Sequence, residues 1–215
     1  MRKIFSGTLS VKTEAIPKLT RSEQKKQDVL RAAIQEFRMF GFAGASMDRI
    51  AELAGASKRT VYNHFVSKEQ LFDLATTELW RSSKSAARVA FDPSQSAEQQ
   101  LLTICRQCLA VYEQEDFIEL ARVVMAEYIR SSEKAQAAMQ RMASQEGGLE
   151  LWLAQAQQHG VLTIPDIQLA ATQFWGMFKA FVFWPRVFNL STETKVDEAV
   201  VLSSIRMFIS FYSSK

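Results

Sequence analysis

The chain is poor in the residues on which disulfide frameworks and metal sites depend. It has two cysteines and two histidines among 215 residues, and two cysteines cannot form a disulfide framework. Cys105 and Cys108 are three residues apart, but His64 and His159 lie elsewhere and do not complete a zinc site. A thiol switch would have only Arg106 as an electropositive neighbour. We therefore expect both thiols to be buried as small hydrophobic groups.

Other kinds of chemistry are missing as well. The sequence shows no nucleophile paired with a base, no glycine-rich phosphate loop and no carboxylate pair at metal-ligand spacing. We therefore expect no enzyme activity, no cofactor and no metal. The most apolar segment, 174–188, is too short to span a membrane and contains Lys179, Pro185 and Arg186. Because the N-terminal residues also lack an apolar stretch of signal-peptide length, we expect a cytoplasmic protein without membrane contact.

What the chain does contain is enough apolar residues for a core, and an uneven charge. Hydrophobic residues make up 47% of the chain and charged residues 23%, which argues against disorder. Residues 1–68 hold 13 Lys and Arg against 6 Asp and Glu, a net charge of +7, whereas residues 69–215 hold 13 against 17, a net charge of −4. A basic segment of this kind suits a surface that faces nucleic-acid phosphates.

Apolar residues recur at helical spacing along most of the chain, and no strand-like alternation is found. We therefore predict an all-α fold. The first helix covers residues 22–40 and ends at Gly41. Gly147 and Gly148 fall inside one long predicted helix and could kink or split it. The other helices are predicted at residues 47–53, 58–65, 68–90, 97–113, 117–130, 133–158, 166–187 and 196–210.

Residues 46–68 have the pattern of a helix-turn-helix. A short helix ends at Gly55, which can adopt a positive φ, and Ser57 is a typical N-cap for a second helix. Two helices joined by such a tight turn present the second helix to the DNA major groove. At 100° per residue, Val61 and Phe65 lie on the inward face of that helix. The alternative is that this is an ordinary polar helix face. The coincidence of a capped turn with basic outward side chains favours a recognition helix instead.

The outward face and the helix starts carry candidate DNA contacts of two kinds. Side chains that match base edges in the major groove are Lys58, Arg59, Thr60 and Asn63. Flanking side chains and side chains at helix starts, where free N–H groups favour anions, are expected to contact phosphates. These are Ser46, Tyr62, His64 and Lys68.

A resemblance supports this interpretation. The stretch VLRAAIQEFRMFGFAGASMDRIAELAGASKRTVYNHFVSKEQLF, residues 29–72, is similar to the N-terminal domain of the TetR/AcrR family of bacterial transcriptional regulators. The resemblance implies DNA contacts by Thr60, Tyr62, His64 and Lys68. It also implies a connecting helix that starts at Lys68, a ligand pocket between the central helices, and a homodimer formed by the last two long helices.

The predicted domains are a basic N-terminal arm at residues 1–21, a helix-turn-helix DNA-binding domain at 22–68 and a regulatory and dimerisation domain at 69–215. The arm is expected to be flexible. The alternative is that it lies along DNA phosphates or enters a minor groove.

The C-terminal segment is rich in aromatic and methionine side chains. Most are expected in the core or at a subunit interface, but their excess also fits a cavity for a bulky apolar ligand. The pocket candidates are Tyr112, Phe117, Met125, Tyr128, Trp152, Phe174, Trp175 and Phe178.

Together these features predict a homodimeric transcriptional regulator without enzyme activity. We expect a repressor that binds a palindromic DNA operator and is released by a small, largely apolar effector. The alternative is a DNA-binding regulator that responds to a protein partner or acts without a small-molecule inducer.

Overall fold

The computed structural model describes residues 20–143, 147–190 and 197–213, and every regular element in these ranges is a helix. The all-α prediction is therefore confirmed, with one isolated β-bridge between Leu162 and Ser213. The arm predicted at residues 1–21 lies outside the described residues except for Thr20 and Arg21. The helices are α1 (Arg21–Gly44), α2 (Met47–Leu53), α3 (Lys58–His64), α4 (Lys68–Ala86), α5 (Ala97–Tyr112), α6 (Glu115–Arg130), α7 (Ser132–Ala143), α8 (Gly148–Gln158), α9 (Ile167–Val182), α10 (Trp184–Val187) and α11 (Glu198–Tyr212).

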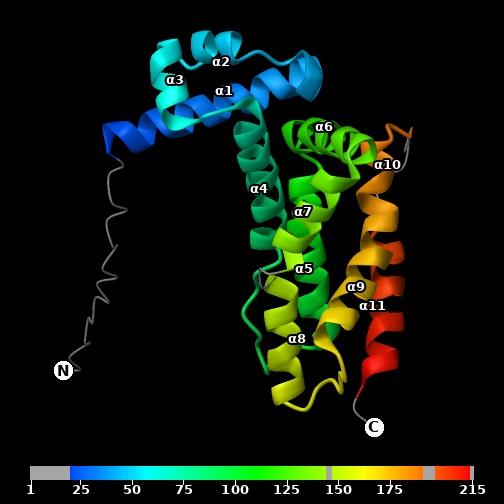
Figure 1. Cartoon of the computed structure of the whole chain (residues 1–215). Coiled ribbons are helices and arrows are strands. Elements are labelled where there is room, and N and C mark those ends of the chain that lie inside the picture. The colour runs from blue at the N-terminus through cyan, green and yellow to red at the C-terminus, as the bar shows by residue number, and fades with distance from the viewer. Residues whose placement is uncertain (1–19, 144–146, 191–196, 214–215) are drawn as a thin grey trace, which may run out of the picture.

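Helices α1–α3 form a head at one end of the molecule (Figure 1). Helix α1 begins with a capping box, in which Thr20 accepts from the Glu23 N–H and the Glu23 carboxylate accepts from the Thr20 N–H. Gly41 was predicted to end this helix. It has a φ of 67° and breaks the regular geometry, but one more turn follows as far as Gly44. The head is held by buried aromatic side chains, among them Phe37, whose ring meets Phe72 of α4 edge-on at 5.4 Å.

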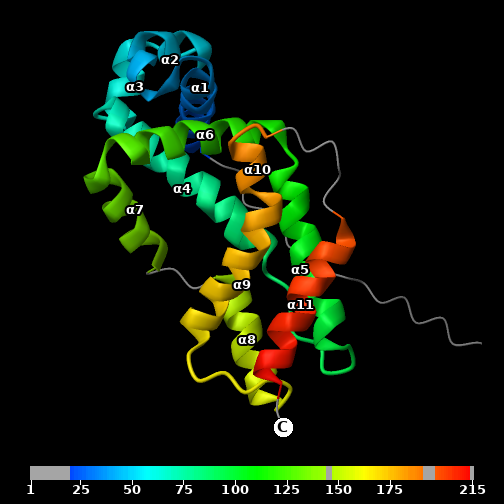
Figure 2. The same ribbon diagram turned by 90° about the vertical axis from the view of Figure 1, so that its right-hand side faces the viewer.

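Helix α4 runs from the head into the second part of the molecule, where α5, α8, α9 and α11 form a bundle (Figure 1). Ser67 caps its start by accepting from the Gln70 N–H. The helix ends at Ala86, four residues before the predicted end at residue 90. In the view turned by 90°, α6 lies across the end of the bundle and beneath α1 (Figure 2).

Two predicted helices are each divided into two. The helix predicted at 133–158 becomes α7 and α8, as the two glycines suggested, and residues 144–146 between them lie outside the described ranges. The helix predicted at 166–187 becomes α9 and α10, with Pro185 in the first turn of α10. Proline has no N–H to donate and is tolerated in a first turn, so a new helix starts where the previous one ends.

The interior of the bundle is apolar and largely aromatic. Trp152 is fully buried, and its indole N–H donates to the Gln100 side-chain oxygen at 3.0 Å. Cys105 and Cys108 are buried as expected, and burial raises the pKa of Cys108 to about 12 and that of Cys105 further. Both thiols are therefore neutral at physiological pH.

Helix α1 of the head contacts α4, α6 and α7. Arg38 of α1 forms an ion pair with Asp116 at 2.7 Å and a second one with Glu119, both on α6. The ring of Phe42 has the Lys68 ammonium 4.9 Å from its centroid and the Lys134 ammonium, from α7, 3.9 Å from it. These contacts tie the orientation of the head to the helices beneath it.

Candidate nucleic-acid interface

The turn between α2 and α3 has the geometry that the sequence predicts. Gly55 has a φ of +55°, and the Ala56 N–H donates to the Ala51 carbonyl at 3.0 Å. Ser57 caps α3 by accepting from the Thr60 N–H at 3.1 Å. The turn is also held from outside, because the Lys25 ammonium on α1 donates to the carbonyls of Ala54 and Gly55 at 3.3 and 3.1 Å. The orientation of α3 is thus fixed by backbone geometry, a cap and a distant lysine.

Helix α3 has a buried face and an exposed face. Val61 is fully buried, and Phe65, its C-cap residue, is almost fully buried. Arg59, Tyr62 and Asn63 point away from the core and are exposed. A guanidinium, a phenol and an amide on one short capped helix are groups that hydrogen-bond to base edges and phosphates.

The other two predicted base readers have partners within the head. The Lys58 ammonium forms an ion pair with Asp48 of α2 at 2.6 Å, and this contact raises the pKa of Lys58. The hydroxyl of Thr60 shares a hydrogen bond of 2.8 Å with that of Ser57. Lys58 would have to leave Asp48 to reach a guanine, whereas Thr60 can still present its methyl group.

The predicted phosphate contacts also divide into side chains of α3 that reach solvent and side chains that have partners within the head. Tyr62 is half exposed, and His64 is half-buried in the last turn of α3. Ser46 caps α2, accepting from the Asp48 N–H at 3.3 Å. The Lys68 ammonium donates to the carbonyls of Ala43 and Ala45 at 3.2 and 3.1 Å. The charge of Lys68 therefore holds the segment that precedes α2, and a phosphate contact at the start of α4 stays a prediction.

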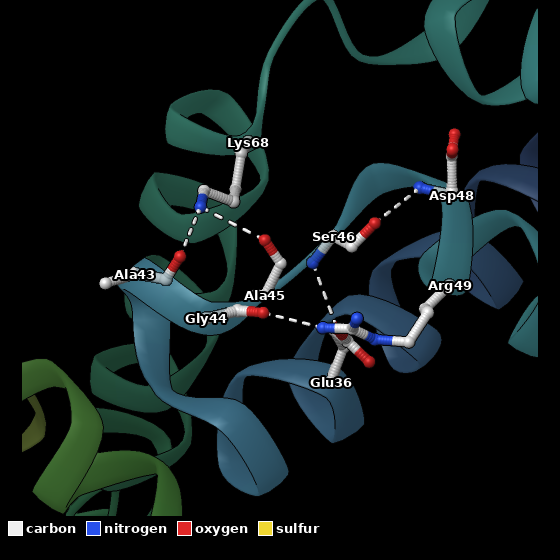
Figure 3. A network of polar contacts seen from close by, with 8 residues as sticks. All are labelled: Glu36, Ala43, Gly44, Ala45, Ser46, Asp48, Arg49 and Lys68. Carbon is white, nitrogen blue, oxygen red and sulfur yellow. Dashed lines mark hydrogen bonds and ion pairs between the residues drawn. The ribbon is translucent and has the colours of Figure 1, made fainter.

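A polar network joins these helix starts and was not predicted (Figure 3). Glu36 of α1 is completely buried, and its Oε1 accepts from the Ser46 N–H at 2.9 Å and from Arg49 of α2 at 2.8 Å. Arg49 also donates to the Gly44 carbonyl at 2.6 Å. A glutamate within an amphipathic helix gives no sequence signal of such a role. Its only indication is its place beside buried Phe37 on the inward side of α1.

A cavity of about 230 Å³ lies between α4, α5, α8 and α9. Two indole rings, Trp80 and Trp175, contribute to its wall, together with charged side chains from three helices. These charged residues are Lys84, Glu150 and Lys179. The first turn of α8, with Gly147 and Gly148, forms another part of the wall. The cavity is thus partly polar, whereas the sequence predicts an apolar lining for a ligand pocket.

Of the eight predicted pocket residues, Tyr112 and Trp175 line this cavity. Trp152, Phe174, Phe178 and Phe117 are buried in the core instead, and Met125 and Tyr128 are half-buried against it. The aromatic rings pack on one another, as Tyr112 does on Phe183 at 5.3 Å. The density of aromatic residues in the sequence therefore indicates the core more than the cavity. What sets the cavity apart from the core is its charged lining of two lysines and one glutamate.

Among the described residues, none of the helices combines the length and the apolar character that a membrane crossing needs. In the same part of the chain, no three His, Cys, Asp or Glu side chains gather where they could hold a metal ion.

The fold and the site define a class: a helix-turn-helix head, with a basic outward helix, on a separate helical body. Comparison with known protein families leads to the same class. Residues 29–75 match the family of bacterial regulatory proteins of the tetR type, and residues 99–214, more than half of the chain, match the AefR-like transcriptional repressor C-terminal domain. The chain belongs to the TetR family of transcriptional regulators, a family of DNA-binding proteins and not of enzymes.

Individual relatives agree with this assignment. A crystal structure of a TetR family transcriptional regulator from Pseudomonas syringae pv. tomato is 38% identical, with a TM-score of 0.72 over 90% of this chain and 99% of that one. The flavonoid-responsive regulator FrrA is 27% identical, with a TM-score of 0.69 over 89% and 98% of the two chains. The uncharacterised regulator YhgD of Bacillus subtilis is 40% identical over 34% of this chain and 38% of its own length. The aligned part thus spans little more than a third of that curated relative.

Proposed function

We propose that this chain is a homodimeric repressor that binds a palindromic operator and releases it when a small molecule occupies the C-terminal domain. The observation that carries the proposal is the exposed row of Arg59, Tyr62 and Asn63 on a helix capped by Ser57. Residues 1–68 also hold a net charge of +7, which favours phosphate contact at physiological salt. A regulator that binds the bacterial chromosome acts in the cytoplasm, which is the location we propose.

Dimerisation through α9 and α11 is proposed from their exposed apolar side chains. Phe181 of α9 is 50% exposed, and Met207 and Phe211 of α11 are 61% and 77% exposed. The two helices flank a groove lined by Met177, Phe181, Val200 and Met207 together with small residues. An apolar patch of this kind marks a protein contact, and a two-fold dimer places two recognition helices in successive major grooves about 34 to 36 Å apart.

Control by a small molecule is proposed from the cavity beside α4. A closed interior would have favoured a protein partner, or regulation without an inducer. The cavity instead adjoins α4, the helix that starts in the head. A ligand that binds two arrangements of α4 with different affinities shifts their populations. The name of the similar regulator FrrA describes a response to flavonoids, which supports a small-molecule effector here as well.

The DNA-binding part is tested by gel-shift titration on the promoter fragment that the purified protein protects from nuclease digestion. Arg59→Ala should weaken binding about ten-fold or more, because a bidentate arginine–base contact contributes about 1–3 kcal/mol. Asn63→Ala should change the preferred base at one position of each half-site. Arg88→Ala removes the same charge two residues beyond the end of α4, where Arg88 is exposed, and should leave binding unchanged.

If Arg59→Ala and Asn63→Ala both bind like the unaltered protein, α3 is not the recognition helix. If the protein protects no DNA at all, the repressor function itself is wrong.

A further inference from the structure

We propose that the cavity between α4, α5, α8 and α9 binds a small planar aromatic acid. In this complex Lys179 binds the carboxylate, Trp80 and Trp175 contact the ring, and Glu150 accepts a hydroxyl or amino hydrogen of the ligand. The proposal rests on the proposed function, in which this cavity is the effector site.

Lys179 is the first argument for an acid. It is on α9, at the cavity wall, and most of its side chain is covered by protein. The described residues offer its ammonium two indole faces, Trp80 and Trp175, each with the ring centroid at 5.9 Å, but no hydrogen-bond acceptor and no ion pair. Burial lowers the pKa of Lys179, because a covered ammonium loses hydration that favours its charged form. A ligand carboxylate would supply the missing acceptor and would add to the negative charge that Glu150 already places near Lys179.

The rest of the wall near Lys179 also favours an anion. Lys84 adds a second ammonium from α4. The first turn of α8 lines the cavity through Gly147 and Gly148, and the N-terminus of an 11-residue helix carries partial positive charge. Glu150 opposes an anion from that same turn, so the acid group is expected on the Lys179 side of the cavity.

The second argument concerns the ring. Trp80 and Trp175 come from different helices, α4 and α9, and both line the cavity. Because Lys179 is near both rings, a flat ligand with its acid group on the lysine lies within reach of both. Indole faces pack well on other aromatic rings, in offset or edge-on arrangements. The indole N–H of Trp80 lies beside the Tyr128 hydroxyl, so Trp80 offers the ligand its ring and not a donor.

The third argument comes from Glu150. Its Oε2 atom is buried and has no hydrogen-bond partner, and an unpaired buried carboxylate oxygen is costly. A hydroxyl or amino group on the ligand would satisfy it.

The volume limits the size of the ligand. Pockets for drug-sized molecules occupy about 300–1,000 Å³, and this cavity has about 230 Å³. One or two fused rings fit, whereas a bulky apolar effector does not.

The test measures binding of matched acids and amides to the full-length protein by isothermal titration calorimetry. The probes are 4-hydroxybenzoate, salicylate and indole-3-carboxylate, each beside its neutral carboxamide. We expect at least one acid to bind at least ten-fold more tightly than its amide. Lys179→Gln should remove this difference, and Lys179→Arg should keep part of it. Lys26→Gln, an exposed lysine in the head, is the matched control and should behave like the unaltered protein.

The contribution of Glu150 is tested with 4-methoxybenzoate, which cannot donate a hydrogen bond. It should bind several-fold more weakly than 4-hydroxybenzoate, and Glu150→Gln should reduce that gap. Circular dichroism and melting curves establish that each variant is folded. If Lys179→Gln is unfolded, the arginine variant and the acid–amide comparison on the unaltered protein still decide the question.

The proposal is overturned if no acid in the panel binds more tightly than its amide, or if a folded Lys179→Gln variant keeps the preference. A gel shift on the protected promoter separates this failure from that of the proposed function. Protein that binds DNA but shows no preference for acids refutes the ligand class only. Protein that binds no DNA refutes the repressor function, whatever the calorimetry shows.

Discussion

At the scale of single residues, the ion pair between Lys58 and Asp48 sets how much positive charge the head offers to DNA. The two groups are 2.6 Å apart and both are exposed. An exposed pair contributes little to stability, so its main effect is to withhold Lys58 from a nucleic acid and to add a negative charge nearby.

Asp48→Asn should therefore tighten operator binding. One more lysine becomes available to a phosphate, so a plot of log affinity against log salt concentration should steepen by about 0.9. The measurement is a set of gel shifts between low and moderate salt. Glu133→Gln removes the same charge from α7, where Glu133 is exposed, and should leave the slope unchanged. Equal slopes for all three proteins would show that Asp48 does not restrain Lys58.

The buried Glu36 gives a residue-scale prediction about stability. Its side chain is 1% exposed, and Arg49, 44% exposed, is its only ion-pair partner among the described residues. Arg49→Ala would leave a buried carboxylate without its counter-charge and should lower the free energy of unfolding by about 3 kcal/mol. Urea denaturation measures this change. Adding Glu36→Gln to that variant should recover part of the loss, and a double variant no more stable than Arg49→Ala would contradict the explanation.

At the scale of elements, the start of α8 can approach the end of α4 closely because Gly148 has no side chain. A Cβ on Gly148 would overlap the backbone of Ala87 and Arg88, which cannot move like a flexible side chain. Gly148→Ala should therefore cost about 1–3 kcal/mol by overpacking and lower the melting temperature by several degrees. Gly44→Ala is the control, because its Cβ would meet Phe40 at an ordinary 3.4 Å. Equal melting temperatures for the two variants would mean that α4 and α8 separate easily.

The elements also show why part of the structure could be predicted from the sequence. The turn at Gly55 and Ser57 depends on conformational and capping preferences within a few residues, and those are visible in the sequence. The contact of Lys25 with that turn, and that of Glu36 with Arg49, depend on how α1 lies across α2. Such tertiary contacts leave no periodic signal.

The cavity shows the same limit. Trp152 and Trp175 look alike in the sequence, but Trp152 fills the core and Trp175 lines the cavity. Only the packing of α8 against α9 distinguishes them. The break before Pro185 was foreseeable from local chemistry, because proline rarely continues a helix. The sequence nevertheless predicts one continuous helix over residues 166–187, because the apolar pattern continues on both sides of the break.

At the scale of the whole molecule, the exposed face of α9 and α11 should decide the oligomeric state. Phe181→Glu places a charge beside the α9–α11 groove and should convert a dimer into a monomer in analytical ultracentrifugation at micromolar concentration. Operator affinity should fall with it, because two linked heads bind far better than one. Ile129→Glu alters an apolar residue on α6 that is 83% exposed and should leave the dimer intact. A dimer that survives Phe181→Glu would place the interface elsewhere.

The hold of Lys68 on the carbonyls of Ala43 and Ala45 makes the head and the start of α4 move together. Helix α4 has 19 residues and is therefore about 28 Å long. Its other end, at Trp80 and Lys84, is at the cavity. A tilt of about 10° about Lys84, which is about 24 Å from Lys68 along the helix, would displace Lys68 by about 4 Å, which exceeds the DNA rise of about 3.4 Å per base pair. In a two-fold dimer both heads would move. Helix α4 would then act as a lever, because a sub-ångström shift of its cavity end around a ligand becomes a shift of several ångströms at each head. The distance between the two recognition helices would change accordingly.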